Sequence, residues 1–203
     1  MVEYGLAGIA SMLCVGAVDF DKERKPGETS AIRIALERVS NWPECDTQFR
    51  RYPEVLSPLV AERVRAHYYH VGERKYLVRL PCRQSAYNQD EVYVLVEPRA
   101  QPPARVLVFP DFSFAGCDGS DSPVRRATTT TPPGRLFDPK SLTLFGLSKC
   151  RGMGDCGSWV SYRFSQDGFE MVDYRRKTRC DGKGLRDDYD IRLPPPGWTR
   201  VSH

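Results

Sequence analysis

The chain has 203 residues, enough for one well-buried core or two small domains. Hydrophobic residues make up 40% and charged residues 28% of it, which excludes a wholly disordered or collagen-like chain. The formal net charge is only +4, so the composition does not require a nucleic-acid partner, and 16 glycines and 16 prolines favour short elements joined by turns.

Residues 4–18 form an uncharged, largely apolar run. It is shorter than the ~20 residues of a membrane span but matches the apolar part of a signal peptide. No Lys or Arg precedes it, and Glu3 is acidic. We therefore interpret it as an imperfect signal or anchor, with an N-terminal helix as the alternative. Residues 21–28 are highly charged and indicate a linker, so that residues 1–28 precede the folded domain.

One helix is expected, over residues 30–39. The apolar side chains at helical spacing are Ile32, Ala35, Leu36 and Val39. Ser30 is a suitable N-cap, and Trp42-Pro43 ends the helix.

Downstream, alternating apolar and polar residues and short β-branched runs predict strands. The expected strands are residues 63–70, 75–80, 91–97, 105–109, 142–147, 158–165 and 169–175. A helix over residues 57–65 is the alternative for the first of these. Gly72-Glu73 and Asp167-Gly168 mark hairpin turns.

The predicted fold is mainly β, with antiparallel sheets in a sandwich-like or barrel-like arrangement and one N-terminal helix. Residues 29–193 are expected to form a single domain. Within it, residues 116–135 read as a long surface loop, because they combine prolines, glycines and successive threonines. Residues 194–203 follow as an extended tail.

The chain contains seven cysteines. Cys14 lies in the N-terminal apolar run, and the others are Cys45, Cys82, Cys117, Cys150, Cys156 and Cys180. An even set in a turn-rich β chain suggests three disulfides made in an oxidising compartment, and the residues alone leave the pairing open. Free thiols in a reducing cytosol are the alternative. No CxxC pair occurs, so neither a structural metal nor a cofactor is expected.

The stretch from Lys149 to Ser158 is the most unusual, because Gly152, Gly154 and Gly157 follow one another closely. Such a loop can hold an anion with its backbone N–H groups or can simply make a tight connection between strands. It lacks the Gly-Lys-Ser/Thr ending of a nucleotide-binding loop. The candidate binding residues are Arg151, Gly152, Gly154, Asp155, Tyr87 and Asn88.

Catalytic patterns are sparse. No GxSxG, HExxH or SxxK motif occurs. His67 and His70 fall on opposite faces of an expected strand, so joint metal ligation is not expected. A hydrolase or redox site would have to assemble from separated residues such as Asp155, Tyr87 and His67.

Strand aromatics offer a second possible binding face, with core packing as the alternative. These are Tyr68, Tyr69, Tyr76, Tyr87, Tyr93, Tyr162 and Tyr174. Residues 175–179 add a small basic cluster, but no nucleic-acid recognition motif accompanies it.

Three cysteine-containing segments are similar to successive motifs of the domain of unknown function 1176 family. They are Cys82-Arg83-Gln84-Ser85-Ala86-Tyr87-Asn88, Cys150-Arg151-Gly152-Met153-Gly154-Asp155-Cys156-Gly157-Ser158 and Cys180-Asp181-Gly182. Trp42-Pro43-Glu44-Cys45 resembles the start of that domain, and the resemblance covers roughly residues 41–190. It is greatest to cyanobacterial-type members, in which Ser and Leu stand where this chain has Cys150 and Met153.

The resemblance implies an exported, β-rich bacterial protein with no assigned activity and no catalytic residues to transfer. It also implies a disulfide pairing. Cys45, Cys82, Cys156 and Cys180 match the family, whereas Cys117 and Cys150 are additions and therefore natural partners of each other. The expected bonds are Cys45–Cys82, Cys117–Cys150 and Cys156–Cys180.

These observations together favour a periplasmic or secreted protein that binds a protein, glycan or anion, or that associates with the cell envelope, without catalysis. An enzyme with its site near residues 151–158 and a purely structural scaffold are the alternatives. No confident membrane span is expected.

Overall fold

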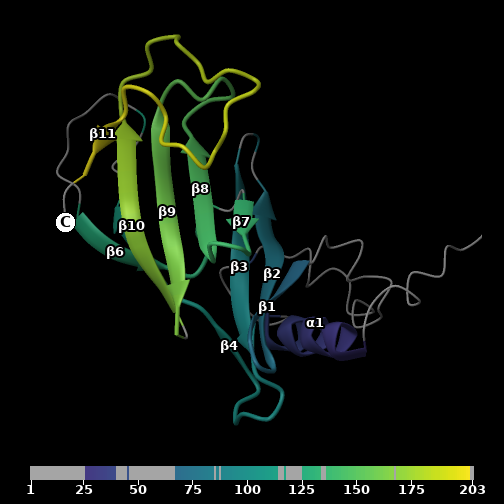
Figure 1. Ribbon diagram of the computed structural model, residues 1–203. Helices are drawn as coiled ribbons and strands as arrows, with labels where there is room; N and C mark the ends of the chain where they lie inside the picture. The colour runs from purple at the N-terminus through teal and green to yellow at the C-terminus, as the bar shows by residue number, and fades with distance from the viewer. Residues whose placement is uncertain are drawn as a thin grey trace, which may run out of the picture.

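The computed structural model describes residues 26–39, 45, 67–84, 86, 88–113, 117, 125–133, 136–166 and 168–201 (Figure 1). In these residues the protein contains one helix and three antiparallel sheets, as the sequence predicts for a mainly β chain. No helix in this part of the chain has the length and apolar character needed to cross a membrane. Residues 1–25 and 57–66 lie outside it, so the apolar N-terminal run and the alternative helix are not described.

The first sheet is a four-stranded meander. Its strands, in spatial order, are β1 (His67–Gly72), β2 (Lys75–Gln84), β3 (Gln89–Val96) and β4 (Ala104–Val106). Val94 and its neighbour Leu95 are both buried, because they point to opposite faces and each face is covered. This double burial explains why β3 reads as a continuous apolar run rather than an alternating one.

The helix α1 (Pro26–Val39) covers one face of this sheet. Ile32, Leu36 and Val39 are buried against strand residues that include Val78 and Val94. The helix begins at Pro26 rather than at Ser30, so residues 26–28 form its first turn and not the end of a linker. A proline at the first helical position loses no intrahelical hydrogen bond, which makes this start favourable.

The other face packs against a five-stranded sheet, so that helix and sheets form successive layers (Figure 1). Its strands, in spatial order, are β11 (Thr199–Arg200), β10 (Gly168–Lys177), β9 (Gly157–Ser165), β8 (Thr143–Lys149) and β7 (Leu136–Asp138). An aromatic cluster joins the two sheets. Phe109 lies 5.5 Å from Tyr93 of the first sheet and 4.6 Å from Phe169 of the second, ring centre to ring centre.

Three of the tyrosines considered as a binding face take part in this core. Tyr93, Tyr162 and Tyr174 are each 2% exposed or less. The hydroxyl of Tyr93 donates a 2.8 Å hydrogen bond to Glu91, a buried carboxylate that also pairs with Arg79. Burial, followed by the charge of Glu91, raises the pKa of Tyr93 well above 10. These tyrosines therefore stabilise the sandwich rather than meet a ligand.

One strand prediction and one loop prediction are wrong. Residues 105–109 do not form one strand: β4 ends at Val106, and β5 (Phe109–Ser113) pairs instead with β6 (Arg125–Thr129). The same ribbon places a strand within residues 116–135, which were expected to be loop. The sequence pattern cannot show this, because burial of Leu107 and Phe109 around exposed Val108 is also what one continuous strand would give, and the break is a change of pairing partner from β3 to β6.

The ends of the last hairpin also differ from expectation. Gly168 pairs with Ser165 and is the first residue of β10, so it belongs to the strand and not to the turn. Residues 194–201 pack on the domain and include a turn in which the Trp198 N–H donates to the Pro195 carbonyl; Trp198 is 5% exposed and Thr199–Arg200 pairs with β10. The segment before residue 194 covers the outer face of the five-stranded sheet. There the carbonyl oxygen of Ile191 accepts a 2.8 Å hydrogen bond from the Trp159 indole.

Candidate functional site

The glycine-rich segment forms a compact bend between β8 and β9. The Cys150 N–H donates to the Cys156 carbonyl across the bend, at 3.1 Å. Gly157 has a φ of +143°, and a Cβ at this position would lie 2.0 Å from the Ser148 carbonyl oxygen. Only glycine fits such a conformation and such a close approach of two strands. The tight connection between strands, one of the two interpretations from sequence, is therefore present.

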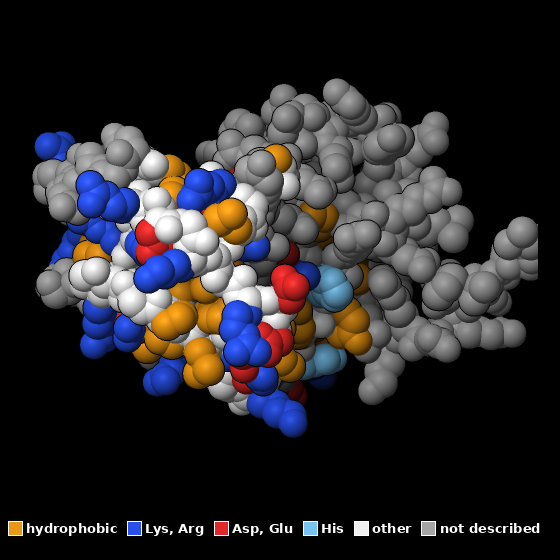
Figure 2. Space-filling view, turned by 90° about the horizontal axis from the view of Figure 1, so that it is seen from above, with side chains coloured by type: hydrophobic (Ala, Val, Ile, Leu, Met, Phe, Trp, Pro, Cys, Tyr) orange, Lys and Arg blue, Asp and Glu red, His pale blue; other side chains and the backbone are white. Residues whose placement is uncertain are grey.

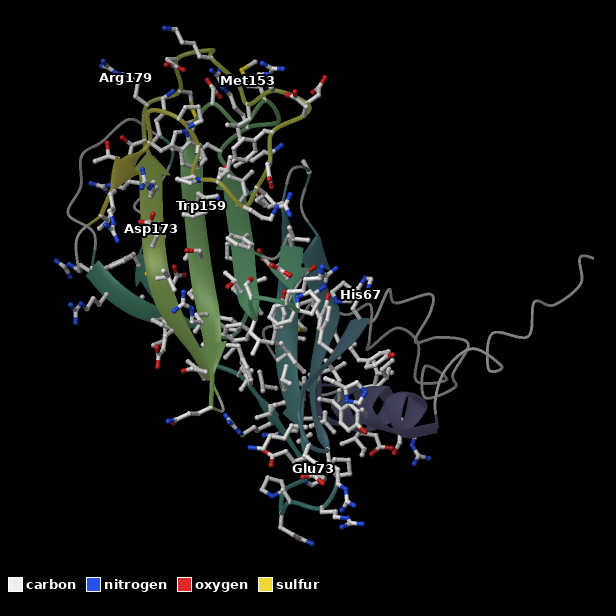
Figure 3. The ribbon with its side chains drawn as sticks, viewed as in Figure 1. His67, Glu73, Met153, Trp159, Asp173 and Arg179 are labelled. Atoms are coloured by element: carbon white, nitrogen blue, oxygen red, sulfur yellow. A yellow bond between two sulfur atoms is a disulfide. The ribbon has the colours of Figure 1, made fainter. Side chains whose placement is uncertain are left out.

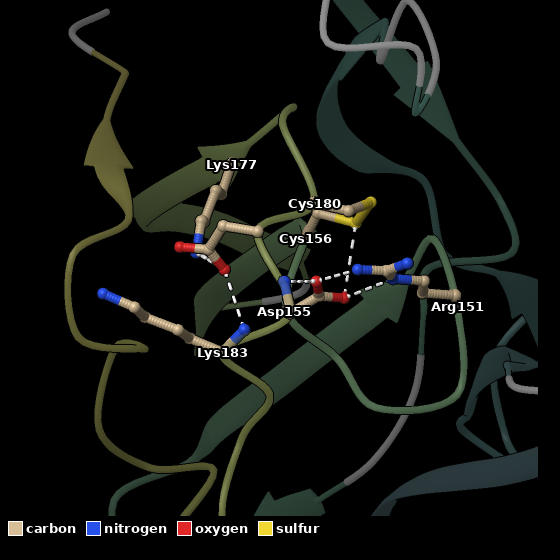
Figure 4. Close-up of polar contacts among 8 residues, drawn as sticks. Arg151, Asp155, Cys156, Lys177, Cys180 and Lys183 are labelled. Carbon is tan, nitrogen blue, oxygen red and sulfur yellow. Dashed lines mark hydrogen bonds and ion pairs between the residues drawn. A yellow bond between two sulfur atoms is a disulfide. The ribbon is translucent and has the colours of Figure 1, made fainter.

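Asp155 lies at the centre of the bend and is completely buried. Arg151 Nε donates to Oδ1 at 2.8 Å, its terminal nitrogen pairs with Oδ2, and the Gly182 N–H donates to Oδ2 at 2.7 Å (Figure 4). The hydrogen bonds from Arg151 are the main cause that lowers the pKa of Asp155 far below its usual value. The side chain is thus a permanently charged anchor inside the loop.

A second loop, from residue 178 to 185, is bound to the first. Cys156 and Cys180 form a disulfide, and the Leu185 N–H donates to the Met153 carbonyl at 3.0 Å. Lys177 and the Lys183 N–H contact Asp181 within the second loop, at 2.9 and 3.0 Å (Figure 4). We call the two loops, residues 150–156 and 178–185, the loop end of the five-stranded sheet.

Asn88 connects the loop end to the first sheet. Its side-chain nitrogen donates to the Lys149 carbonyl at 2.9 Å, and its oxygen accepts from the Lys149 N–H at 2.7 Å. The amide therefore acts as an extra rung of the β-ladder at the end of β8. This contact gives Asn88 a structural role at the loop end.

All three expected disulfides are present. Cys45–Cys82 links the segment after α1 to β2, and Cys117–Cys150 links the segment after β5 to the start of the glycine-rich bend. Their Cα–Cα separations are 4.7 and 5.6 Å, within the range that disulfides adopt. Two of the three bonds therefore end in the loop from Cys150 to Cys156.

Several side chains remain accessible at the loop end, among them Arg179 and Asp181 of the second loop. Met153 is 51% exposed at the tip of the bend, where Figure 3 shows it at the end of the molecule. The Arg151 side chain is 45% exposed even though it pairs with Asp155, and Lys183 is exposed. Figure 2 views the molecule from above and shows hydrophobic, cationic and acidic side chains on this side.

The residues considered for catalysis do not come together in the described structure. Asp155 is already bonded to Arg151 and Gly182, and its low pKa makes it a poor base. His67 begins β1 and lies well away from Met153 (Figure 3). Tyr87 lies outside the described residues. The geometry around Asp155 is that of a structural ion pair.

A group of ligand-type atoms occurs beside it. One carboxylate oxygen of Asp155 and the sulfurs of Cys156 and Cys180 lie within 4.8 Å of one another. The two sulfurs are bonded to each other, so they offer no thiolate, and the carboxylate is engaged by Arg151. In the oxidised protein these three residues are a crosslinked core and not a set of metal ligands.

Sequence reasoning did not identify the contribution of the second loop to the site. The Gly182 N–H and the Leu185 N–H are backbone donors, which no pattern of side chains reveals. The segment Cys180-Asp181-Gly182 was the available signal, because it stands out as a cysteine followed by turn-forming residues.

Substituting Gly157 by alanine should lower the free energy of unfolding by about 2 kcal/mol, since the new Cβ meets a backbone oxygen in a glycine-only conformation. Urea unfolding would measure the effect. Gly182→Ala is the matched control: its φ is +80° but nothing lies within 4 Å of the added Cβ, so about 1 kcal/mol is expected. Equal losses would contradict the close approach of β8 and β9.

The buried charge of Asp155 predicts a pH dependence. Because its pKa is lower folded than unfolded, the stabilisation it gives is present above the unfolded pKa of about 4 and disappears as the pH falls through the folded value. Asp155→Asn should therefore be less stable than the wild type at neutral pH, with the difference narrowing below about pH 4. Thermal unfolding across that range would test this, and a difference that stays constant into acid would contradict it.

Comparisons with known proteins agree with the expected family. Residues 23–192 match the family model described as "Protein of unknown function (DUF1176)". A curated relative, "Uncharacterized protein YpfG" of Escherichia coli (strain K12), is 32% identical over 111 residues, which cover 53% of this chain and 28% of the relative. This chain thus matches little more than a quarter of that relative's length. No solved structure matches significantly.

The similarity to cyanobacterial-type members in particular stays a prediction. The family model spans the glycine-rich bend, the second loop and all three disulfides. On this match the chain belongs to the DUF1176 family.

Proposed function

We propose that this chain is an extracytoplasmic protein, periplasmic or secreted, that binds a partner without catalysing a reaction. We further propose that the loop end of the five-stranded sheet is its contact surface. The observation that carries the proposal is the covalent and ionic locking of two loops around Asp155, with Met153 and the cations Arg151, Arg179 and Lys183 left exposed.

The extracytoplasmic location is supported by the disulfides. Crosslinks of this kind form and persist in oxidising compartments, whereas cytosolic thiols are kept reduced. The sandwich core already buries many large apolar side chains, so the crosslinks do not replace a missing core. Instead, Cys117–Cys150 and Cys156–Cys180 stabilise one loop, which is where an exported protein would need a defined surface.

The binding role is supported by rigidity. A loop held in one conformation before binding loses little conformational entropy when a partner docks. Here the polar groups of Asp155 and Asn88 are satisfied inside the protein, so they hold the loop and leave Met153, Arg151 and Lys183 for contact. An exposed methionine on a surface that also carries cations suits a partner that presents an anionic group next to an apolar one.

The compartment can be tested by thiol labelling in cells. In the periplasmic or secreted fraction, the six described cysteines should resist a maleimide reagent until the protein is reduced, leaving only Cys14 reactive if it is retained. Protein found in the cytosolic fraction with all cysteines reactive would overturn the proposed location.

Contact through the loop end can be tested by affinity capture with oxidised protein. Met153→Ser/Lys183→Ser removes exposed groups and spares the bonds of Asp155, and Lys140→Ser on an exposed turn elsewhere is the matched control. We expect a partner retained by the wild type and the control to be lost by the double variant. Equal capture by all three would remove the loop end from the proposal and favour a structural scaffold.

A further inference from the structure

A cluster of polar side chains lies on the face of the first sheet that packs against the five-stranded sheet. His67 of β1, Arg79 of β2 and Tyr93 of β3 are direct partners in the strand pairing. Direct partners point to the same face, and so do residues two positions apart along a strand. Tyr69 and Glu91 therefore share this face, and Glu91 forms an ion pair with Arg79. We call Tyr69, Arg79, Glu91 and Tyr93 the Arg79 cluster.

The buried end of the Arg79 cluster is well paired. Glu91 is 3% exposed, its Oε2 accepts a 2.8 Å hydrogen bond from the Tyr93 hydroxyl, and its Oε1 lies 3.3 Å from Arg79 Nε. A carboxylate removed from water is costly unless partners of this kind compensate for it. Glu91 and Tyr93 therefore hold the Arg79 guanidinium in position from below.

The guanidinium of Arg79 keeps most of its hydrogen-bonding capacity. It carries five N–H groups. Within the residues that the structure describes, the ion pair with Glu91 is its one polar contact. The Arg79 side chain is only 16% exposed, so water can reach few of the remaining N–H groups. Unpaired donors on a mostly buried cation are costly, and an acceptor supplied by a ligand would remove that cost.

Tyr69 adds a neutral donor beside this cation. Its ring packs on Phe137, at 4.5 Å between ring centres, which holds it in place. Burial is the main cause that raises the pKa of Tyr69 above its ordinary value, and the charges of Arg79 and Glu91 add smaller, opposing effects. The hydroxyl therefore stays protonated at neutral pH. No described residue accepts a hydrogen bond from it, so two kinds of donor lie together without an acceptor.

The chemistry of these donors indicates the class of ligand. A planar guanidinium binds a carboxylate through two hydrogen bonds. A doubly charged group such as phosphate is less suitable, because the buried charge of Glu91 beside Arg79 would repel it. The half-buried ring of Tyr69 favours an apolar substituent next to the carboxylate. A monocarboxylic acid with an apolar part has both properties.

We propose that the Arg79 cluster is a binding site for a small monocarboxylic acid, whose carboxylate pairs with Arg79 and accepts a hydrogen bond from the Tyr69 hydroxyl. Its apolar part contacts the Tyr69 ring. This site goes beyond the binding assigned to the loop end. His67, the strand partner of Arg79, lies well away from Met153 (Figure 3), so the two sites can be tested separately.

Benzoate is the probe, titrated into the oxidised, isotope-labelled full chain and followed by amide chemical shifts. We expect a dissociation constant of about 1 mM, as is usual for a ligand of this size. The shift changes should concentrate in residues 67–71 and 77–81, which belong to β1 and β2. Benzamide has the same shape without the charge and should bind at least about tenfold more weakly. Equal binding of benzamide would overturn the recognition of a carboxylate.

Two variants test the two donors. Tyr69→Phe and Arg79→Lys should each weaken benzoate binding by about tenfold, because the first removes a hydrogen bond to a charged group and the second removes the planar fork while keeping the positive charge that faces Glu91. The matched controls are Tyr76→Phe, on the opposite face of β2, and Arg163→Lys, exposed on β9. They should change the affinity less than about twofold. Unchanged affinity in both test variants would overturn the site.

Three further outcomes would contradict the proposal. Inorganic phosphate that binds more tightly than benzoate would replace the monocarboxylic acid by a different anion. Shift changes confined to residues 150–156 and 178–185 would place the acid at the loop end. No shift change with benzoate at about ten times the expected dissociation constant would remove the site altogether. None of these variants alters Met153 or Lys183, so failure here is distinguishable from failure of the proposed function.

Discussion

Substituting Phe109 by alanine should lower the free energy of unfolding by about 4 kcal/mol, one of the largest losses expected for a single change in this protein. Phe109 is completely buried, and its ring lies 5.1 Å from that of Tyr162 and 4.6 Å from that of Phe169. Its removal would leave a cavity at the point where the two large sheets meet. Chemical denaturation followed by tryptophan fluorescence would measure the loss.

The neighbouring residue provides the control. Val108 is 54% exposed, so Val108→Ala should change the stability by less than about 0.5 kcal/mol. Similar effects at both positions would contradict the arrangement in which β5 carries Phe109 into the core. If Phe109→Ala does not fold, Phe109→Leu should give a smaller loss in the same direction.

Replacing both Cys156 and Cys180 by serine should lower the free energy of unfolding by about 3 kcal/mol, since the bond closes a sequence separation of 24 residues in the unfolded chain. The two loops should also separate more often. We therefore expect the amide protons of Gly182 and Leu185, both hydrogen-bonded across the loop end, to exchange at least about tenfold faster with solvent.

Two controls distinguish a local effect at the two loops from a general loss of stability. Amide protons of β3, such as that of Val94, should lose protection only as far as global stability falls. Cys14→Ser removes a cysteine that takes part in none of the three disulfides, and it should leave the unfolding midpoint unchanged. Unchanged exchange at Gly182 and Leu185 would show that the contacts of Asp155 hold the loops without the disulfide.

Predictions that rest on local sequence patterns agree with the structure, whereas those that depend on contacts between distant residues do not. Most strands were found within a few residues of their expected bounds, because alternation and β-branched runs are local signals. The error over residues 105–109 has a different origin: one apolar run is divided between two sheets, a choice made by the partners of Leu107 and Phe109. The same holds for β6, whose polar, threonine-rich sequence becomes a strand because β5 lies beside it.

The sequence by itself determined the mainly β class, the crosslinked character of the chain and the existence of a glycine-dependent bend before β9. These depend on residue type and on neighbours along the chain. Family resemblance, rather than spacing, provided the correct disulfide pairing. Only the tertiary structure decided that Asp155 and Asn88 hold the bend from within. Burial, ion pairing and shared surfaces are set by residues far apart in the chain, and the order of the amino acids does not show which of them will meet.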